Sequence, residues 1–183
     1  MVSAEDATFI YQRLFAEGIH VWLTGGWGID ALLQEQTRKH KDLDIIMLAD
    51  DVVRMREVLA HDGYQLQELW EENSWVQDAS GAEIPTAFVL QDAQGRQIDA
   101  HAMRIDDQGN GIPAWVNEEQ LIFKTEDLAG IGAIAGLEVC CITPAMQVVC
   151  HIGYDMPDFQ MRDMKLLERR FGVDYPSGQS GTA

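Results

Sequence analysis

Two carboxylates one residue apart, close to a pair of glycines, constrain this chain more than any other feature of its sequence. A short apolar run predicts a buried strand that ends at Gly25 and Gly26, where a backbone without side chains can approach a ligand closely. The next apolar run carries Asp42 and Asp44 at its start. Because side chains alternate along a strand, both carboxylates point to the same side. Two like charges held together require a compensating cation, so the pair predicts a divalent metal site of the kind used in phosphoryl chemistry.

A third acid interrupts a strand-like run further along the chain. Asp99 and His101 lie in residues 97–103, where alternation places them on one face of the strand. Buried carboxylates are rare unless they are paired or bind metal. If this strand lies beside the Asp42 and Asp44 strand, the three carboxylates converge. His101 is then either a histidine that supports the carboxylates or a proton carrier, and the first role is the more common one.

The remaining periodicity predicts helices and strands in mixed order. Asp30 is expected in the first turn of a short helix, where the helix dipole favours an acid. The predicted strands cover residues 19–23, 43–48, 64–70, 74–77, 86–90 and 97–103, with a hairpin over 130–142. The predicted helices cover residues 4–17, 29–33, 50–61, 144–152 and 158–171.

Composition excludes several classes of partner. The chain has 183 residues, enough for one domain or one domain with a helical appendix, and a formal net charge of −17. Such a charge repels nucleic acid backbones and anionic membranes and attracts cations. The three cysteines have neither zinc-site spacing nor an even count, which predicts buried thiols in a reducing compartment. With no apolar signal core or membrane-spanning run, we expect a cytoplasmic protein that binds neither nucleic acid nor membrane.

Several motifs together resemble a known family. Residues 25–30 (Gly-Gly-Trp-Gly-Ile-Asp) and 37–45 (Thr-Arg-Lys-His-Lys-Asp-Leu-Asp-Ile), followed by a lone acid in a later strand, resemble the antibiotic nucleotidyltransferases of the polymerase-beta-like superfamily. The likeness is first to the small lincosamide nucleotidyltransferases and next to the aminoglycoside 2''-type enzymes. Residues 98–101 (Ile-Asp-Ala-His), 139–143 and 151–155 resemble further blocks of the lincosamide group.

The resemblance implies an α+β fold, a mixed sheet with flanking helices and a short helical C-terminal portion. We therefore expect a nucleotidyltransferase core over residues 1–142, a helical portion over 143–172 and a flexible tail over 173–183. The implied reaction transfers AMP from ATP, or a nucleoside monophosphate from another nucleoside triphosphate, to a hydroxyl of a cationic antibiotic with the help of Mg²⁺. Nothing in the sequence separates a monomer from a homodimer.

Matching the family's motifs position by position implies roles for five residues. Asp42, Asp44 and Asp99 correspond to the catalytic and metal-binding carboxylates. Gly25 and Gly26 correspond to the loop that meets the triphosphate.

Two basic residues flank the carboxylate pair. Arg38 and His40 could neutralise phosphate charge, and Arg suits forked contacts. Arg38 could equally belong to a solvated turn, and a structural hydrogen bond from His40 is an equal alternative.

Four residues are candidates for the acceptor site. They are Trp27, His101, Tyr154 and Asp155, the last pairing with a cationic amine. Trp27 and Tyr154 could equally be packing residues.

Other functions are compatible with the same motifs. An aminoglycoside is the second choice of acceptor. The same fold could also serve as a protein- or RNA-nucleotidylating, antitoxin-like module, although the net charge disfavours RNA. A nucleotide-binding module without catalysis is disfavoured by the presence of all three carboxylates.

Overall fold

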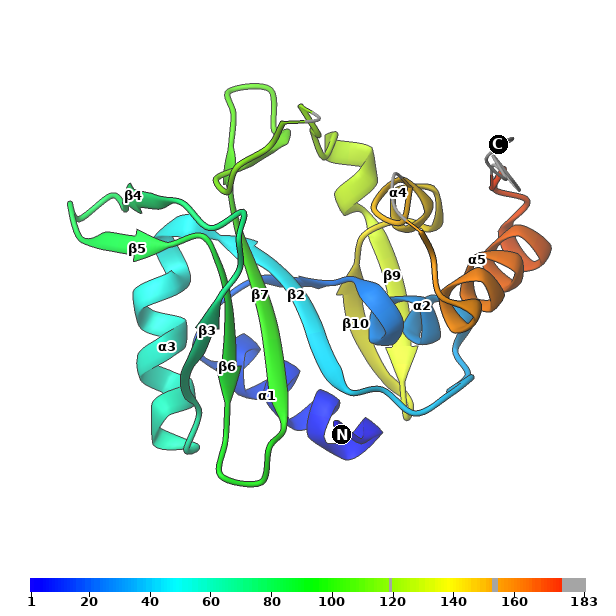
Figure 1. Cartoon of the computed structure of the whole chain (residues 1–183), viewed down its shortest axis with the longest axis horizontal. Helices are drawn as coiled ribbons and strands as arrows, with labels where there is room; N and C mark the ends of the chain where they lie inside the picture. Colours follow the sequence, from blue (N-terminus) through cyan, green and yellow to red (C-terminus); the bar gives the residue numbers. More distant parts are fainter. Residues whose placement is uncertain (119, 153–154, 176–183) are drawn as a thin grey trace.

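A mixed sheet runs through the molecule and decides where the site residues lie (Figure 1). The computed structural model describes residues 1–118, 120–152 and 155–175. The strands run in the order β3-β6-β7-β2-β1-β10-β9, and β8 pairs with β7. The bounds of these strands are β1 Val21–Leu23, β2 Asp42–Leu48, β3 Gln65–Leu69, β6 Ala87–Gln91, β7 Gln97–Ile105, β8 Gly111–Pro113, β9 Gly130–Ile134 and β10 Leu137–Cys141. Helices flank the sheet, so the expected α+β architecture is confirmed.

The helices follow the predicted segments closely. Their bounds are α1 Ala4–Ala16, α2 Gly25–Leu33, α3 Val52–His61, α4 Pro144–Val149 and α5 Asp158–Phe171, with 3₁₀ turns at Ala49–Asp51 and Thr125–Leu128. Ser3 caps α1 in a capping box with Asp6, which satisfies amides that the first helical turn leaves free. Thr143 caps α4, whose first residue is Pro144, as the sequence predicts.

Two differences from the predicted elements have physical reasons. Helix α2 begins at Gly25 rather than at residue 29, because Thr24 takes the cap position and the glycines form the first turn. Asp30 therefore lies in the second turn, and its predicted dipole role is wrong. The predicted loop over 78–85 contains a strand, β5 (Glu83–Pro85), which pairs with β4 (Trp75–Gln77) as a separate ribbon. So short a strand has no periodicity to recognise.

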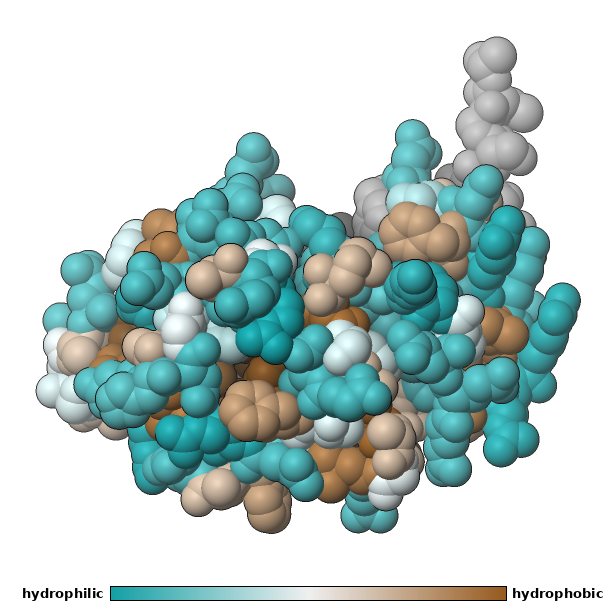
Figure 2. Space-filling view, turned by 90° about the horizontal axis from the view of Figure 1, so that it is seen from below, coloured by the Kyte–Doolittle hydropathy of each residue, from teal (hydrophilic) through white to brown (hydrophobic). Residues whose placement is uncertain are grey.

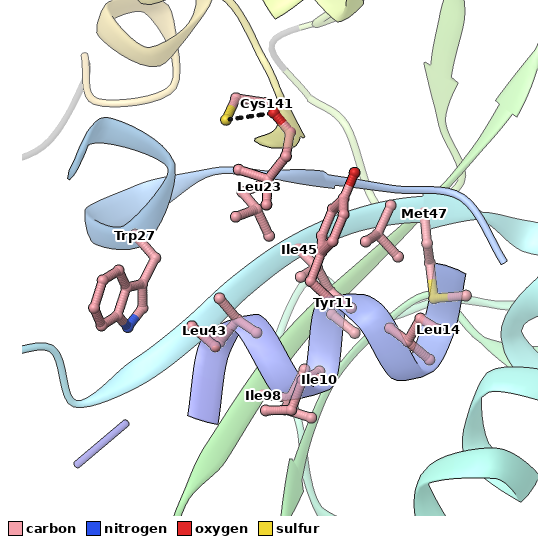
Figure 3. Packing of buried hydrophobic residues seen from close by; sticks show 14 of the residues in the cluster. Ile10, Tyr11, Leu14, Leu23, Trp27, Leu43, Ile45, Met47, Ile98 and Cys141 are labelled. Atoms are coloured by element: carbon pink, nitrogen blue, oxygen red, sulfur yellow. Dashed lines mark hydrogen bonds between the residues drawn. The ribbon is translucent and has the colours of Figure 1, made fainter. Parts of the chain in front are cut away.

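Alternation divides the sheet into two faces with different chemistry. On one face, Leu43, Ile45 and Met47 of β2 pack against Ile10 and Leu14 of α1 in the main core (Figure 3). On the other face, Ile46 joins a smaller cluster whose buried members are Trp22, Ile46, Met103, Phe123, Ile142 and Met146. Asp42 and Asp44 share the parity of Ile46, so they belong to the second face.

The C-terminal helices share the core of the sheet. Met164 and Leu167 of α5 are buried in the main cluster, whereas Phe159 and Phe171 of the same helix are 45% and 40% exposed. The predicted boundary at residue 142 falls between β10 and α4, and the division into core and helical portion stays a prediction. Of the expected flexible tail, Val173 and Tyr175 pack against the main core, and residues 176–183 lie outside the described residues.

The cysteines, the length of the helices and the surface bear on the expected cellular environment. The three cysteines are free thiols, as expected, but only Cys141 is buried, whereas Cys140 and Cys150 are partly exposed. In the described part of the chain, none of the helices has the length and apolarity that a bilayer crossing demands. On the face in Figure 2, hydrophilic residues predominate and hydrophobic side chains are exposed in small groups.

Three hairpin loops share one construction. Each begins with an aspartate, Asp78, Asp92 or Asp106, whose side chain accepts hydrogen bonds from amides two and four residues ahead. Each has glycine as its fourth residue with φ between +76° and +85°, a conformation that glycine adopts without a steric penalty. The carboxylates thus set the turns that return the strands of each hairpin.

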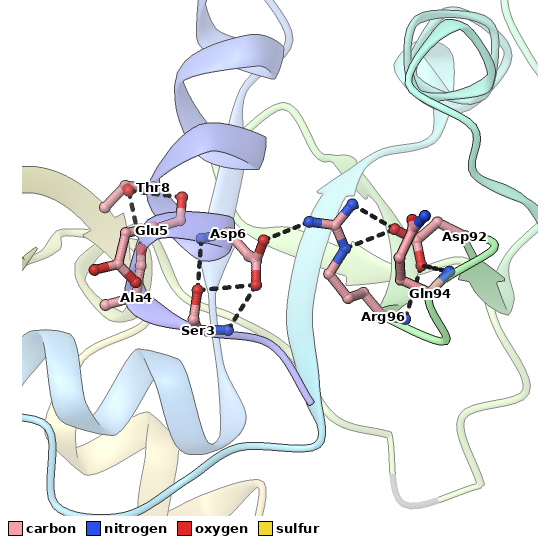
Figure 4. A network of polar contacts seen from close by, with 8 residues as sticks. All are labelled: Ser3, Ala4, Glu5, Asp6, Thr8, Asp92, Gln94 and Arg96. Atoms are coloured by element: carbon pink, nitrogen blue, oxygen red, sulfur yellow. Dashed lines mark hydrogen bonds and ion pairs between the residues drawn. The ribbon is translucent and has the colours of Figure 1, made fainter.

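The second of these loops is tied to the N-terminal helix by an arginine (Figure 4). Arg96 donates through Nε to Asp92 and through Nη1 to Asp6 of α1, so it joins the β6–β7 hairpin to the N-terminal helix. The Asp92 side chain is 1% exposed. Burial alone would raise the pKa of Asp92, but the backbone amide and guanidinium of Arg96 hold that pKa below 3.8.

The Asp92 and Asp106 loops differ in whether an arginine faces the aspartate, and this predicts different losses of stability when each aspartate is replaced. Asp92→Asn keeps an oxygen for the loop amides but removes the charge that faces Arg96, so the free energy of unfolding near neutral pH should fall by about 1–3 kcal/mol. Because the folded-state pKa is lowered, the contribution exists above pH 3.8 and disappears as the pH falls through the folded value. Urea unfolding between pH 3 and pH 7 measures this.

Asp106→Asn is the matched control because its loop has the same hydrogen bonds without an arginine partner. Equal effects of the two substitutions at pH 7 would contradict the role given to Arg96.

Candidate active site

Three carboxylates meet on the second face of the sheet. Strands β2 and β7 are parallel, and their register pairs Asp44 directly with Asp99. Asp42, two residues before Asp44, lies on the same face. The condition stated for convergence, that the two strands be neighbours, is therefore met. This adjacency is the geometric basis of the site.

The carboxylates repel one another strongly enough to shift their titration. Burial, then the charges of Asp42 and Asp99, raise the pKa of Asp44 well above 3.8. Burial also raises the pKa of Asp42, with Lys41 opposing and Asp99 adding to the shift. None of the described side chains donates a hydrogen bond to the Asp44 carboxylate. A group of this kind stabilises a cation that can approach it.

The third carboxylate is held by neighbours. Trp70 donates from Nε1 to Asp99 Oδ1 at 2.9 Å, and His101 Nδ1 lies 3.4 Å from the same oxygen. Across residues 1–118, 120–152 and 155–175, no three carboxylate, imidazole or thiol groups are gathered around one point as a bound ion would gather them. Asp99 thus lies beside the Asp42 and Asp44 pair, and its own Oδ1 is already in contact with Trp70 and His101.

His101 is a charged link between two acids. Its Nε2 lies 3.2 Å from Glu72 Oε1, and its ring packs edge-on against Trp115. Burial alone would lower its pKa, but the contacts with Asp99 and Glu72 raise the pKa to about 9. The imidazole therefore carries a proton near neutral pH and donates to both carboxylates. This geometry matches the supporting role considered for His101.

Gly25 is required by the space around Asp44. A Cβ at Gly25 would overlap Asp44 Oδ2, and the glycine has a positive φ of 56°. The amide of Thr24 donates to the carbonyl of Asp44, which fixes the start of α2 against β2. The first amides of a helix have no carbonyl partners within it. The start of α2 therefore faces the carboxylates with free donors and a positive dipole end, both of which favour anions.

Gly26 is required by a buried histidine. A Cβ there would overlap His40 Nδ1. His40 is 2% exposed, its Nε2 bonds to Asp30, and its Nδ1 has no partner among the described residues. Asp30 also accepts from the amide and hydroxyl of Thr37. The geometry is that of the structural hydrogen bond considered for His40, which here supports the turn under Gly26.

Arg38 connects the start of α2 with α5. Its Nε and Nη2 donate to Asp163 at 3.0 and 2.8 Å, and its guanidinium lies over the ring of Phe159. A Cβ at Gly26 would lie 2.8 Å from Arg38 Nη2, so this guanidinium is next to the glycine turn. Arg38 is thus ion-paired rather than free in a solvated turn.

A cleft of about 300 Å³ opens over Asp44. Its polar side is formed by Thr24, Gly25, Asp44, His101 and His151. Its apolar side is formed by Ile46, Trp115, Leu121, Phe123, Val149 and Ile152. His151 donates from Nδ1 to the carbonyl of Gln147, and burial lowers its pKa, so this imidazole presents no charge. The cleft combines a carboxylate floor with a hydrophobic wall.

Not all of the residues proposed for the acceptor site line the cleft. Trp27 is 1% exposed in the main core and packs against His40, so its assignment to the acceptor site is wrong, and packing is the correct alternative. His101 lines the cleft. Asp155 is exposed and is not part of the cleft lining. Tyr154 lies outside the described residues.

The sequence interpretation missed several residues that contact the carboxylates or form the cleft. Trp70 and Glu72 lie in a polar turn after β3, and Trp115 and Phe123 lie in a segment without periodicity. Loop residues carry no pattern that tells where they fold back. The one available signal was the presence of tryptophans in otherwise polar segments.

Comparisons with known proteins agree with this geometry. The model of the family described as Aminoglycoside-2''-adenylyltransferase matches residues 8–167. A lincosamide resistance protein of Staphylococcus haemolyticus is 25% identical over 167 residues, which make up 91% of this chain and 95% of that protein.

Solved structures are similar over most of the chain. The lincomycin-bound crystal structure of the lincosamide antibiotic adenylyltransferase LnuA gives a TM-score of 0.75 at 24% identity, covering 91% of this chain and 97% of that one. The crystal structure of ANT(2'')-Ia in complex with adenylyl-2''-tobramycin gives 0.67 at 18% identity, covering 91% and 87%. At these identities the likeness establishes the nucleotidyltransferase fold.

The contact between Gly25 and Asp44 predicts a specific destabilisation. Gly63→Ala introduces a side chain at positive φ with no atom within 4 Å of its Cβ, so it should lower the free energy of unfolding by about 1 kcal/mol. Gly25→Ala has the same backbone cost and also displaces the Asp44 carboxylate, which should cost about 1–3 kcal/mol more. Urea unfolding of both variants measures the difference, and equal losses would contradict the overlap.

Proposed function

The chain belongs to the aminoglycoside-2''-adenylyltransferase family and is a nucleotidyltransferase, and on that premise we propose that it transfers AMP from ATP to a hydroxyl of an antibiotic, with Mg²⁺ and with a lincosamide as acceptor. The observation that carries the proposal is the pairing of Asp44 with Asp99 on neighbouring strands, with Asp42 two residues away and Asp44 in a cleft that has an apolar wall. Because ATP is the proposed donor, we assign the reaction to the cytoplasm.

The carboxylates have the chemistry that a magnesium site needs. Carboxylate oxygens are the ligands that Mg²⁺ prefers, and a cation would offset both the burial and the mutual repulsion that raise the pKa values of Asp42 and Asp44. These two residues, with Asp99, would hold the ion. When bound, Mg²⁺ would supply charge stabilisation at the attacking and leaving oxygens of the phosphoryl transfer.

The triphosphate is assigned to the start of α2. The free amides of the Gly25–Gly26 turn and the positive end of the helix dipole favour an anion there. Arg38 is next to the turn and would add a forked contact to a phosphate, at the cost of its bonds to Asp163. His40 contributes by supporting Gly26 from below rather than by contacting phosphate.

The acceptor hydroxyl is assigned to the cleft, beside Asp99. A carboxylate within reach of the attacking hydroxyl can accept its proton as the bond to the α-phosphorus forms and the bond to pyrophosphate breaks. Asp99 Oδ2 has no hydrogen-bond partner among the described side chains and is available for this. His101 Nδ1 lies 3.4 Å from Asp99 Oδ1, on the oxygen that also accepts from Trp70, and so leaves Oδ2 open to the hydroxyl.

The wall of the cleft favours a lincosamide over an aminoglycoside. Aminoglycosides are polar cations with several amino groups, and their recognition calls for several acids. Among the described residues that line the cleft, Asp44 is the only acid, and six are apolar. An acceptor with an alkyl part and a single amine matches such a lining better. The family description and the likeness to ANT(2'')-Ia favour the aminoglycoside alternative, which is therefore tested in parallel.

The first prediction concerns the acceptor. Incubation of the chain with ATP, Mg²⁺ and single antibiotics should give a product heavier by one AMP with lincomycin and clindamycin, and much less or none with tobramycin or kanamycin. Mass spectrometry of the antibiotic and release of pyrophosphate measure the transfer. Modification of aminoglycosides alone would show that the alternative acceptor is the correct one. Absence of any product would refute the transfer of AMP to an antibiotic.

The second prediction concerns the carboxylates. Asp44→Asn should lower the transfer rate by about 100-fold or more, since even the partners of metal ligands contribute 10- to 100-fold. The fold should survive, because the substitution removes repulsion, and circular dichroism checks this. Asp107→Asn changes an exposed acid and is the matched control. Retained activity in Asp44→Asn would refute the metal role.

A further inference from the structure

We propose that Trp70 and Glu72 are positioning residues that hold Asp99 in its reactive orientation. They lie on segment 70–74, which connects β3 with β4 and lies against the start of β6 and the middle of β7. This inference rests on the proposed function, because it assigns the segment a task in nucleotidyl transfer. Neither residue belongs to the set of Asp42, Asp44 and Asp99.

Both contacts made to Asp99 go to the same oxygen. Trp70 Nε1 donates to Oδ1, and His101 Nδ1 lies against Oδ1 as well. Fixing one oxygen by two donors from different directions fixes the rotation of the carboxylate. The second oxygen is thereby kept available for a hydroxyl or a cation. Glu72, bonded to the far nitrogen of His101, in turn fixes the imidazole ring.

Such a clamp is needed because of the charges beside Asp99. Asp44 is its direct partner across the strands, and Asp42 adds a further negative charge. Repulsion of this kind turns a free carboxylate away from its neighbours. The hydrogen bond from Trp70 and the ion pair with His101 oppose that rotation while the cation and nucleotide are still absent.

Segment 70–74 is anchored firmly enough to act as a clamp. Asn73 Oδ1 accepts from the amides of Thr86 and Ala87. Thr86, which is fully buried, exchanges hydrogen bonds with the backbone of Ser74 through its hydroxyl. The amide of Trp70 donates to the carbonyl of Ala87. The segment is therefore fastened to the start of β6 on both sides of Glu72.

The same segment also holds the acceptor wall. The carbonyl of Glu72 accepts from the amide of Val116 at 2.8 Å, next to Trp115 of the cleft lining. Trp115 in turn packs edge-on against His101. One anchored segment thus fixes both the proposed base and one wall of the cleft.

The decisive variant is Trp70→Phe, which keeps an aromatic ring and removes the indole N–H. Loss of one hydrogen bond to a charged group should lower kcat on the order of 10- to 100-fold, with the KM for ATP and for lincomycin changed less than about threefold. Trp75→Phe, on neighbouring β4, is the matched control because Trp75 is 52% exposed, and its kcat should stay at the wild-type value. A purely structural role of Trp70 would instead change KM, kcat and melting temperature together, or none of them.

A second measurement does not depend on turnover. In the chelator-treated chain, ¹H–¹⁵N spectra contain one indole signal from each of the 5 tryptophans, and Trp70→Phe identifies the signal of Trp70. Asp99→Ala should move this signal clearly, because its acceptor is lost, whereas Asp107→Asn should leave it in place. An unmoved signal in Asp99→Ala would show that the contact does not exist and would overturn the proposal.

The two measurements separate the inference from the function on which it rests. An inactive wild-type chain with every antibiotic refutes the proposed function, and with it any task of the clamp in transfer. An active wild type with unchanged kcat in Trp70→Phe overturns the positioning role alone. An active wild type with a selective loss of kcat, together with the moved indole signal, supports it.

Discussion

The parallel pairing of β2 with β7 is the constraint on which the site depends. It places Asp44 opposite Asp99 and gathers negative charge that the nearby cations His101 and Arg38 offset only in part. A folded protein tolerates such repulsion where function requires it and where the surroundings limit its consequences. Here the surroundings are the glycine at the start of α2, which makes room for Asp44, and the donors that hold Asp99. The same arrangement that is unfavourable for the empty chain is favourable for a cation with a triphosphate.

Strand alternation lets one strand serve two purposes. On β2, odd-numbered residues from Leu43 to Met47 bury their side chains against α1, and the even-numbered residues Asp44 and Ile46 line the cleft. The hydrophobic core thus fixes the register, because a shift by one residue would bury the acids and expose the core. Precision at the site is a consequence of packing on the opposite face of the sheet.

The sequence reveals this part of the site because alternation and acids within apolar runs are local patterns. The placement of Asp99 beside Asp44 needed one further condition, the adjacency of two strands that are distant in sequence. The alternating pattern names this condition but does not show whether it is met. Trp27 was misassigned because it follows the glycines directly, yet the helix that begins at Gly25 turns its side chain into the core. Trp70 and Glu72 could not be found, since their roles depend on a loop anchored by Asn73 and Thr86 through contacts with no periodicity.

The C-terminal helices are coupled to the start of α2 by polar contacts. Arg38, beside the glycine turn, pairs with the buried Asp163 of α5. Gln147 of α4 is fully buried, accepts from the hydroxyl of Thr24, and lies where any side chain at Gly28 would be. Because a buried polar group is costly to leave unpaired, movement of either helix would disturb the turn that carries the proposed phosphate site. The sequence separates a helical portion from the core at residue 142. In the structure this portion packs against α2, on the side to which we assign the nucleotide. Its packing helps to keep the amides of that helix aimed at the carboxylates.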